Sequence, residues 1–221
     1  MAIYIGHEGV VRKCQSMDSG YYAEERHILD ALTGIDGVTR HVMQWSEQLS
    51  HLEIDLDELV INTMDSDGKD TSFLATNKMS DINEYGSLTV TSNSVQIYCS
   101  KAGYDLCVSP EVRLVFKDGH RVRVRFLHNT TAQISFTVGY SIGFRGDGFY
   151  TCYFCGYPVY EGHVNNSVSG TKTIGPYFSM GSDFAFCSAG TLGSYAYVQQ
   201  TYQSCTIGGK SFPIKVINNL K

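Results

Sequence analysis

The stretch from Val112 to Phe126, "VRLVFKDGHRVRVRF", decides the fold class that we expect for this chain. Apolar and basic residues alternate on both sides of Lys117-Asp118-Gly119, which is the pattern of a β-hairpin. A two-residue turn at Asp118-Gly119 would mix apolar and charged side chains on each face. A three-residue loop with Gly119 in the left-handed region separates them. We expect this second register, because a one-residue slip moves every side chain to the opposite face.

The second register predicts a hairpin with one apolar and one cationic face. It pairs Phe116 with His120 and Leu114 with Val122. The apolar face carries Val112, Leu114, Phe116, Val122, Val124 and Phe126. The opposite face carries Val115 and five cations, which are Arg113, Lys117, Arg121, Arg123 and Arg125. Solvation, an acidic neighbour such as the N-terminal part of another subunit, or an anionic ligand would each account for these cations, so they are our candidate interface residues.

The same β pattern continues through the rest of the chain after residue 86. Short runs rich in Val, Ile, Thr, Tyr and Phe are separated by Gly, Ser, Asn and Asp; among them are "SLTVTSNSVQIYCS", "TAQISFTVGYSIGF", "SYAYVQQTY" and "FPIKVIN". Their spacing is typical of a sandwich or barrel, and strong amphipathic helix patterns are absent there. We therefore predict a mainly β fold, an antiparallel β-sandwich of the jelly-roll type, with a small α+β N-terminal region.

Charge divides the chain into two parts. Residues 1–84 contain 6 Lys and Arg against 16 Asp and Glu, whereas residues 85–221 contain 11 against 6. The net charge of −5 therefore combines an N-terminal part of −10 with a C-terminal part of +5. We place a boundary in the polar segment 77–87, which gives an N-terminal region at 1–84 and a C-terminal sandwich at 85–221. The segment 51–63, "HLEIDLDELVINT", alternates like a strand, with a helix as the alternative, and 46–84 is either a linker or part of the sandwich.

Composition excludes several classes of protein. Hydrophobic residues make up 43% of the 221 residues, which is enough for a core, so wholesale disorder is not expected. The sequence has no apolar run of about 18 residues that would predict a membrane span, and no basic-then-apolar N-terminus that would predict a secretory signal. The negative overall charge disfavours nucleic acid as a partner. The seven scattered cysteines fit buried, reduced thiols of a protein made in a cytosol better than a disulfide framework.

No motif in the sequence predicts catalysis, and we expect no catalytic residues, no metal and no cofactor. Cys152-Tyr-Phe-Cys155 has the spacing of a zinc or redox pair but lacks a second pair of ligands, so core thiols are the better interpretation. Asp65, Asp67 and Asp70 depart from the spacing of a calcium loop, which favours a solvated acidic turn over a calcium site. Paired carboxylates for glycoside hydrolysis meet in space rather than in sequence, but the C-terminal part has only 6 acidic residues.

Tyrosines are dense between residues 144 and 202. Along strands such residues divide between core and surface, and exposed rings also form platforms on which sugars stack. The sequence does not rank the candidates, which are Tyr150, Tyr153, Tyr157, Tyr160, Tyr195, Tyr197 and Tyr202.

A short element repeats at the N-terminus. "IGHEGVVRKC" at 5–14 and "TGIDGVTRHV" at 33–42 share the pattern Gly-x-x-Gly-Val-x-Arg-basic-apolar with an offset of 28 residues. A more divergent copy lies halfway between them at 19–28, and the segment around it also has the pattern of a short helix that ends at Gly34. The first copy lacks the Lys-Ser/Thr of a phosphate loop, so its glycines are better explained as turn residues between strands.

The first copy, from Tyr4 to Cys14, resembles short N-terminal repeats in tail-associated proteins of phages and prophages of Gram-positive bacteria. Those repeats typically have the pattern Tyr-Ile-Gly-x-x-Gly-Val-x-Arg-Lys-Val. In such proteins the repeats commonly precede β-sandwiches similar to carbohydrate-binding modules, and residues 86–116 look like the beginning of such a sandwich. The motif covers about a fifth of the chain.

The resemblance implies a structural protein of the virion, assembled in the cytoplasm of the bacterial host and located in a tail, baseplate or fibre. Gly6, Gly9, Arg12 and Lys13 would dock it to the particle. The sandwich would decorate the particle or adhere to a host-surface glycan such as cell-wall polysaccharide, as a homo-oligomer among other virion proteins. The alternatives are a stand-alone carbohydrate-binding module and a tail-borne polysaccharide depolymerase.

Overall fold

The computed structural model describes residues 3–7, 10–14, 32–35, 38–41, 48–123, 134–175, 186–193 and 195–221. The chain divides into two compact units, residues 1–49 and residues 50–221. The described residues of both units are mainly strands, and those of the second unit also include a short 3-10 helix, η1 (Met79–Ile82). The expected mainly β fold is confirmed.

The described part of the N-terminal unit consists of two antiparallel hairpins. They are β1–β2 (Ile3–His7 and Val10–Cys14) and β3–β4 (Leu32–Ile35 and Val38–His41). Every residue pair of the second hairpin lies 28 positions after a pair of the first: Tyr4–Lys13, Ile5–Arg12, Gly6–Val11 and His7–Val10 correspond to Leu32–His41, Thr33–Arg40, Gly34–Thr39 and Ile35–Val38. The sequence repeat is therefore also a structural repeat.

The strand-and-turn interpretation of the first repeat copy is confirmed by the β1–β2 pairing. The expected helix around the middle copy is corrected at its end, because Leu32 and Gly34 belong to strand β3, where Gly34 pairs with Thr39. The rest of that predicted helix lies outside the described residues.

The second unit is a sandwich built from three sheets. Its strands are β5 (Leu49–Leu56), β6 (Leu59–Met64), β7 (Asp70–Thr76), β8 (Gly86–Val90), β9 (Ser94–Cys99), β10 (Tyr104–Val108), β11 (Glu111–Phe116), β12 (Arg121–Arg123), β13 (Ile134–Phe154), β14 (Tyr157–Ile174), β15 (Cys187–Thr191), β16 (Ala196–Ile207), β17 (Lys210–Phe212) and β18 (Ile214–Asn218). The largest sheet has the order β14-β13-β16-β9-β8, with β17 paired to β16. The other two have the orders β15-β10-β6-β7 and β12-β11-β5-β18.

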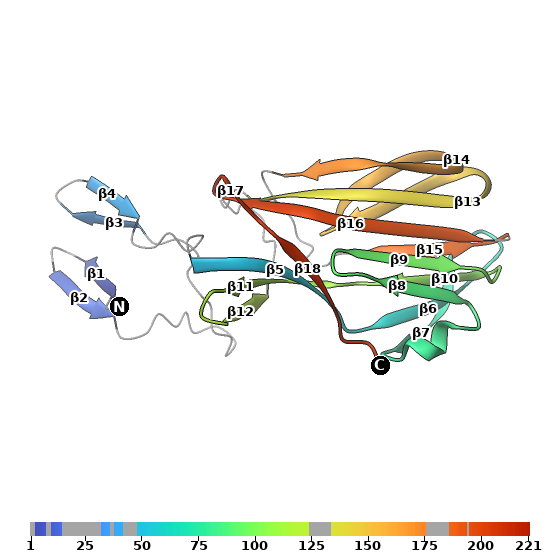
Figure 1. Cartoon of the computed structure of the whole chain (residues 1–221), viewed down its shortest axis with the longest axis horizontal. Helices are drawn as coiled ribbons and strands as arrows, with labels where there is room; N and C mark the ends of the chain where they lie inside the picture. The colour runs from blue at the N-terminus through green and yellow to red at the C-terminus, as the bar shows by residue number, and fades with distance from the viewer. Residues whose placement is uncertain are drawn as a thin grey trace. The chain divides into compact units, whose positions relative to one another are not determined.

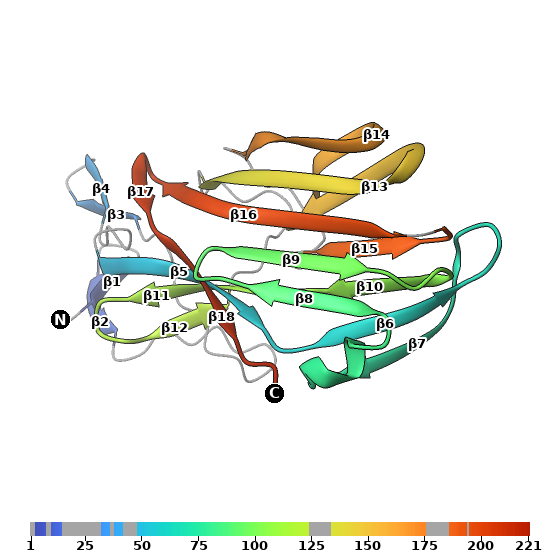
Figure 2. The same cartoon turned by 45° about the vertical axis from the view of Figure 1, so that its right-hand side comes forward.

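The two smaller sheets continue into each other. Only Asp57-Glu58 separates β5 from β6, and only Ser109-Pro110 separates β10 from β11, so both strand pairs pass from one sheet into the next. Figure 2 shows β5 continuing into β6, and Figure 1 shows the long strands β13, β14 and β16 running alongside one another. β15 and β10 pack against β9 and β16, which closes the apolar core between the layers.

Residues 50–84 belong to the second unit, so the boundary that we predicted at 84/85 is wrong and lies at 49/50. β6 pairs with β10, and β5 pairs in parallel with β18. Strands from both sides of the predicted boundary thus share sheets. The strand interpretation of the segment 51–63 is confirmed, and Leu52 and Ile54 of that segment lie fully in the core.

The predicted hairpin register is confirmed over the described residues. Leu114 pairs with Val122, and the Phe116 N–H donates to the His120 carbonyl at 2.8 Å. Gly119 has a φ of 91°, as the three-residue loop requires. Leu114 is buried on the apolar face, while Val124, Arg125 and Phe126 lie outside the described residues.

Gln200 is a fully buried polar residue on the central strand β16. Its Nε2 donates to the Tyr153 carbonyl at 2.8 Å and to the Phe186 carbonyl at 3.1 Å. Its Oε1 accepts a hydrogen bond of 3.1 Å from the Tyr202 hydroxyl. One side chain therefore makes three hydrogen bonds and ties β16 to the end of β13 and to the segment before β15.

Replacing Gln200 with Met is expected to destabilise the protein by roughly 2–4 kcal/mol, because the substitution removes three hydrogen bonds, one of them to the buried Tyr202 hydroxyl. Urea unfolding followed by circular dichroism and tyrosine fluorescence measures this change, since the one tryptophan of the chain, Trp45, precedes the sandwich. The matched control is Gln199→Met, one position along the same strand on the outer face, which is expected to change stability by no more than about 0.5 kcal/mol. Equal losses in the two variants would contradict the bridging role of Gln200.

Candidate functional site

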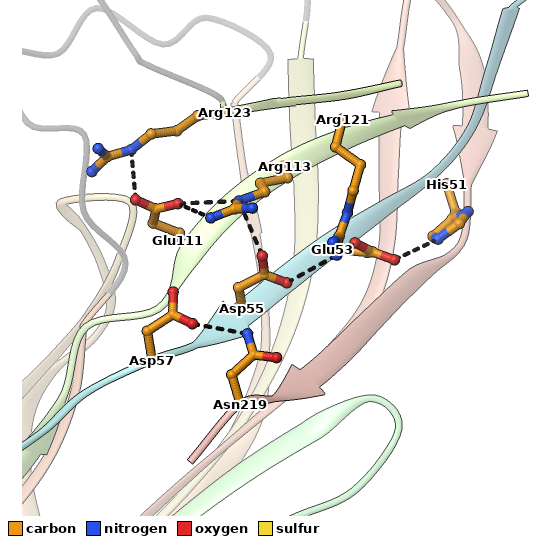
Figure 3. Close-up of polar contacts among 9 residues, drawn as sticks. All are labelled: His51, Glu53, Asp55, Asp57, Glu111, Arg113, Arg121, Arg123 and Asn219. Carbon is orange, nitrogen blue, oxygen red and sulfur yellow. Dashed lines mark hydrogen bonds and ion pairs between the residues drawn. The ribbon is translucent and has the colours of Figure 1, made fainter. Parts of the chain in front are cut away.

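The cationic face that the sequence predicts lies against acidic residues of the same chain. Arg113 on β11 and Arg121 on β12 point toward strand β5, which presents Glu53 and Asp55 between its core residues (Figure 3). Asp55 is only 1% exposed. The arginines of the hairpin β11–β12 thus lie beside two carboxylates of the neighbouring strand β5, on the same face of this sheet.

The distances define an ion-pair network across β5 and β11. Arg113 Nε lies 3.0 Å from Asp55 Oδ2, and Arg113 Nη2 lies 2.8 Å from Glu111 Oε2. Arg121 pairs with Glu53 and lies 3.6 Å from Asp55 Oδ1, which has no hydrogen bond in the described structure. Three carboxylates and the arginines between them therefore form one connected group (Figure 3).

Two further contacts extend the network at its ends. Arg123 Nε lies 3.1 Å from Glu111 Oε1, and His51 Nε2 lies 3.1 Å from Glu53 Oε1. Arg123 is 44% exposed, so its pair with Glu111 is screened by water and contributes little to stability.

Burial and the arginines act in opposite directions on the two carboxyls of β5. Burial raises the pKa of Asp55 above its ordinary value, although the charges of Arg113 and Arg121 oppose this change. Burial also opposes ionisation of Glu53, but hydrogen bonds from Arg121 and His51 outweigh it, so the pKa of Glu53 is lowered. Asp55 is therefore the group of the cluster that depends most on its cationic partners.

The structure gives three of the five candidate cations partners within the chain. Arg113, Arg121 and Arg123 all contact carboxylates of the sandwich itself, so β5 and β11 of the same chain supply an acidic neighbour for these three cations. An anionic ligand would have to compete with these carboxylates. Lys117 is exposed in the hairpin loop, and Arg125 lies outside the described residues. The anionic-ligand role stays a prediction.

The candidate docking residues lie in the first N-terminal hairpin. Gly6 pairs with Val11, and Lys13 pairs with Tyr4 near the open end of the hairpin. Arg12 pairs with Ile5, and Gly9 lies outside the described residues. The backbone positions of Gly6, Arg12 and Lys13 are repeated by Gly34, Arg40 and His41 in the second hairpin.

A second polar cluster, which the sequence analysis missed, lies on β6, β7 and β10. Asn62 Nδ2 donates to Asp70 Oδ2 at 3.2 Å and to Asp105 Oδ2 at 3.4 Å. Burial, and then the neighbouring charge of Asp70, raise the pKa of Asp105 to about 7. Asp105 can therefore exchange a proton near neutral pH. The signal in the sequence was a polar residue inside each of the apolar strands "VINT" and "YDLCV".

The Cys152–Cys155 pair lies in the core, as predicted. All six described cysteines are buried with free thiols, and burial raises the pKa of Cys152 to about 11. Cys155 forms the turn with Gly156 between β13 and β14, and both residues have positive φ. Because the thiolate is the reactive form, these thiols are poor nucleophiles and poor metal ligands at neutral pH.

The acidic turn at 65–70 has a structural role. Asp65 Oδ1 accepts the backbone N–H groups of Asp67 and Lys69, each at 2.9 Å, while Asp70 contacts Asn62. Among the described residues, no three His, Cys, Asp or Glu side chains are grouped closely enough to hold a metal ion. None of the helices in the described part of the chain is long and apolar enough to cross a membrane.

The candidate tyrosines divide between core and surface. Tyr202 lies in the core, and Tyr150 donates a hydrogen bond of 2.5 Å to the Ser188 carbonyl. Tyr153 and Tyr195 are exposed. Sequence reasoning overlooked Phe73, which is 77% exposed on β7.

Comparisons with protein-family models, with curated proteins and with solved structures returned no match for this chain. The geometry of the described residues is therefore the basis on which a function is proposed below.

Replacing Arg113 with Met is expected to destabilise the protein by roughly 2–4 kcal/mol, because buried Asp55 loses its closest cation. The control Arg123→Met removes an exposed cation and is expected to cost less than about 1 kcal/mol. Urea unfolding near neutral pH measures both. Adding Asp55→Asn to Arg113→Met should recover part of the loss, since a neutral amide needs no cation. A loss as small as that of the control would contradict the network.

Asp105 is expected to make stability fall as pH rises from about 4 to about 7, because the folded protein keeps a proton on Asp105 that the unfolded chain has already released. Asp105→Asn should remove this slope and raise the free energy of unfolding at about pH 8 by at most about 4 kcal/mol, with little change at about pH 4. Urea titrations at both pH values measure the effect. Asp67→Asn, in the exposed turn, is the control, and an unchanged slope in Asp105→Asn would contradict the prediction.

Proposed function

We propose that this chain is a structural protein of a phage or prophage particle, in a tail, baseplate or fibre. Residues 1–49 attach it to the particle, and the sandwich of residues 50–221 is presented to the outside. The observation that carries the proposal is the structural repeat of β1–β2 in β3–β4 with the same register and an offset of 28 residues.

A repeated hairpin of this size supports an attachment role for a physical reason. A single two-stranded hairpin is marginally stable in water, because it buries little apolar surface. The sandwich, in contrast, has its own core and forms a separate unit. Short hairpins that are linked to a domain with its own core become more stable when they pack on a further surface. A particle supplies such a surface in many copies.

The sequence of the hairpins is consistent with a docking element. Each carries a glycine and an arginine at equivalent register positions, Gly6 with Arg12 and Gly34 with Arg40. The first copy also resembles the N-terminal repeats of tail-associated proteins described above. Gly6, Gly9, Arg12 and Lys13 are the residues that we assign to docking.

The proposal includes the surroundings of the protein. Its neighbours are other virion proteins and further copies of this chain, and it is assembled in the cytoplasm of the bacterial host. The sandwich either decorates the particle or adheres to a glycan on the host surface. The rows of hydroxyls, amides and tyrosines on the outer face of the largest sheet, described below, favour glycan adhesion and also keep a stand-alone carbohydrate-binding module as the second candidate function.

Deleting residues 1–47 is expected to abolish incorporation into particles while leaving the sandwich folded, because β5 and its buried Leu49 are retained. The measurement is an immunoblot of gradient-purified particles from cells that produce either form, together with cooperative unfolding of the purified variant. Arg12→Ala combined with Lys13→Ala should lower incorporation in the full chain. The control is Arg123→Met on the sandwich, which should be incorporated normally.

Two results would contradict the proposal. One is absence of the unaltered chain from purified particles. The other is incorporation of the deletion variant at the same level as the unaltered chain, which would place the attachment surface on the sandwich.

A further inference from the structure

The largest sheet of the sandwich has two chemically different faces. Side chains that point inward from β16, such as Val198 and Tyr202, lie in the core. Side chains at the alternate positions, such as Gln199 and Thr201, point outward and are partly exposed. The outward positions form the surface that we call the outer face.

The outer face consists of rows of residues that pair across neighbouring strands. The first row is Ser87, Tyr98, Tyr197, Gly143 and Ser167, in the order β8, β9, β16, β13 and β14. The second is Thr89, Gln96, Gln199, Ser141 and Ser169. The third continues with Thr201, Gly139 and Thr171, and the fourth with Ser204, Thr137 and Thr173.

None of these positions carries a charge. Lys, Arg, Asp and Glu make up 18% of the chain, and soluble proteins commonly place such residues on the solvent face of a sheet. Here the face offers hydroxyl groups, side-chain amides and phenol rings instead. Its hydrogen-bonding groups both donate and accept, since hydroxyls and amides have both capacities.

A tyrosine ring of the first row lies over Gly143 of the neighbouring strand. Gly143 lies opposite Tyr197, and a Cβ at Gly143 would stand 2.3 Å from Tyr197 Cε1. The missing side chain therefore makes room for the ring to lie over the neighbouring strand. The Tyr197 hydroxyl is 3.5 Å from Ser141 Oγ, which holds the ring toward the second row.

Two more rings stand near the same end of the sheet. Tyr98 is the partner of Tyr197 across β9 and β16, and its ring centroid lies 6.2 Å from that of Tyr195 at an angle of 31°. Tyr195 is 36% exposed. The face thus begins with a group of three tyrosines and continues with rows of hydroxyls and amides.

We propose that the outer face binds an uncharged glycan, with sugar rings stacked on Tyr197 and Tyr98 and sugar hydroxyls bonded to the rows beyond them. The inference deepens the proposed function, because it assigns the adhesive surface and the class of its ligand. Stacking suits the apolar face of a sugar ring, and the donor and acceptor groups suit its hydroxyls. The rows themselves carry no cation, which favours an uncharged glycan, and exposed Arg145 lies beyond the first row, opposite Tyr195.

The regular spacing of the rows favours a polymer over a single sugar. Neighbouring strands lie about 4.8 Å apart, so equivalent polar groups recur at regular steps across the sheet. The other occupant for such a face is the same face of a second copy of this chain. Charge-free exposed rows suit that contact as well, so the experiment includes it as an outcome.

The experiment uses affinity electrophoresis of the full chain in gels that contain dextran, mannan, galactan or a soluble β-glucan, with dextran sulfate and polygalacturonate as charged comparisons. The expected result is retardation by at least one uncharged polymer that persists at about 0.5 M NaCl, since no ion pairs are involved. Tyr197→Ala should weaken binding about tenfold or more, which corresponds to about 1.4 kcal/mol.

Two further variants separate binding from folding. Gln199→Glu changes one amide to a carboxylate of the same shape, so it should weaken binding about tenfold while the melting temperature stays close to that of the unaltered chain. Phe73→Ala removes an exposed ring from β7 in another sheet and should leave binding unchanged.

Three results would overturn the inference. They are no retardation by any uncharged polymer, retardation that Gln199→Glu does not affect, and an oligomer that Gln199→Glu dissociates in light scattering without any glycan binding. The last result would assign the face to a second copy of the chain. Each of these leaves the particle role intact if the unaltered chain is still found in purified particles, so the two failures are distinguishable.

Discussion

The hydrogen bonds of Gln200 connect the largest sheet of the sandwich with the segment that leads into β15 of a second sheet. Apolar packing alone is non-directional, whereas the two carbonyls that Gln200 binds fix the end of β13 and the segment before β15 against β16. β13 reaches this position because its pairing shifts between Gly143 and Asp147. The ring of Phe154 then packs 5.1 Å from that of Phe136 on the same strand. The amide of Gln200 thus holds the far end of this long strand near β16 and the start of β15.

The parts of the fold that the sequence predicts are those in which apolar and polar residues alternate along a strand. The hairpin register over residues 112–123 and the strand character of 51–63 were predicted correctly, because alternation places the apolar side chains of each strand, such as Leu52, Ile54 and Leu114, on its core side. β7 and β15 carried no such pattern, since "DTSFLAT" is exposed along its length and "CSAGT" consists of small residues. The domain boundary failed for an electrostatic reason. Acidic β5 and basic β11 differ in charge because they pair with each other, not because they belong to different domains.

The candidate sites, like the fold, can be predicted from the sequence only in part. The arginines of the hairpin were visible in the sequence, but their carboxylate partners on β5 lie about sixty residues earlier, and only the sheet order brings them together. The outer face of the largest sheet was invisible, because it is assembled from alternate residues of five strands. Gly143 leaves room for the Tyr197 ring, and this role can be recognised only once the strand register places the two residues opposite each other. A sequence pattern shows which side chains share one face of a strand. Only the pairing of strands shows which side chains of different strands lie close together.

The parallel pairing of β5 with β18 has a consequence for the order of synthesis. Leu52 pairs with Ile214, 162 residues later, so the first strand of the sandwich leaves the ribosome long before one of its two neighbours exists. Closing so long a loop is entropically costly and slows folding. During that interval one edge of β5 is open to strands of other chains. Charged side chains on an unpaired edge disfavour pairing with a strand of another chain. Glu53 and Asp55 are therefore expected to reduce such pairing of β5 until β18 has been synthesised.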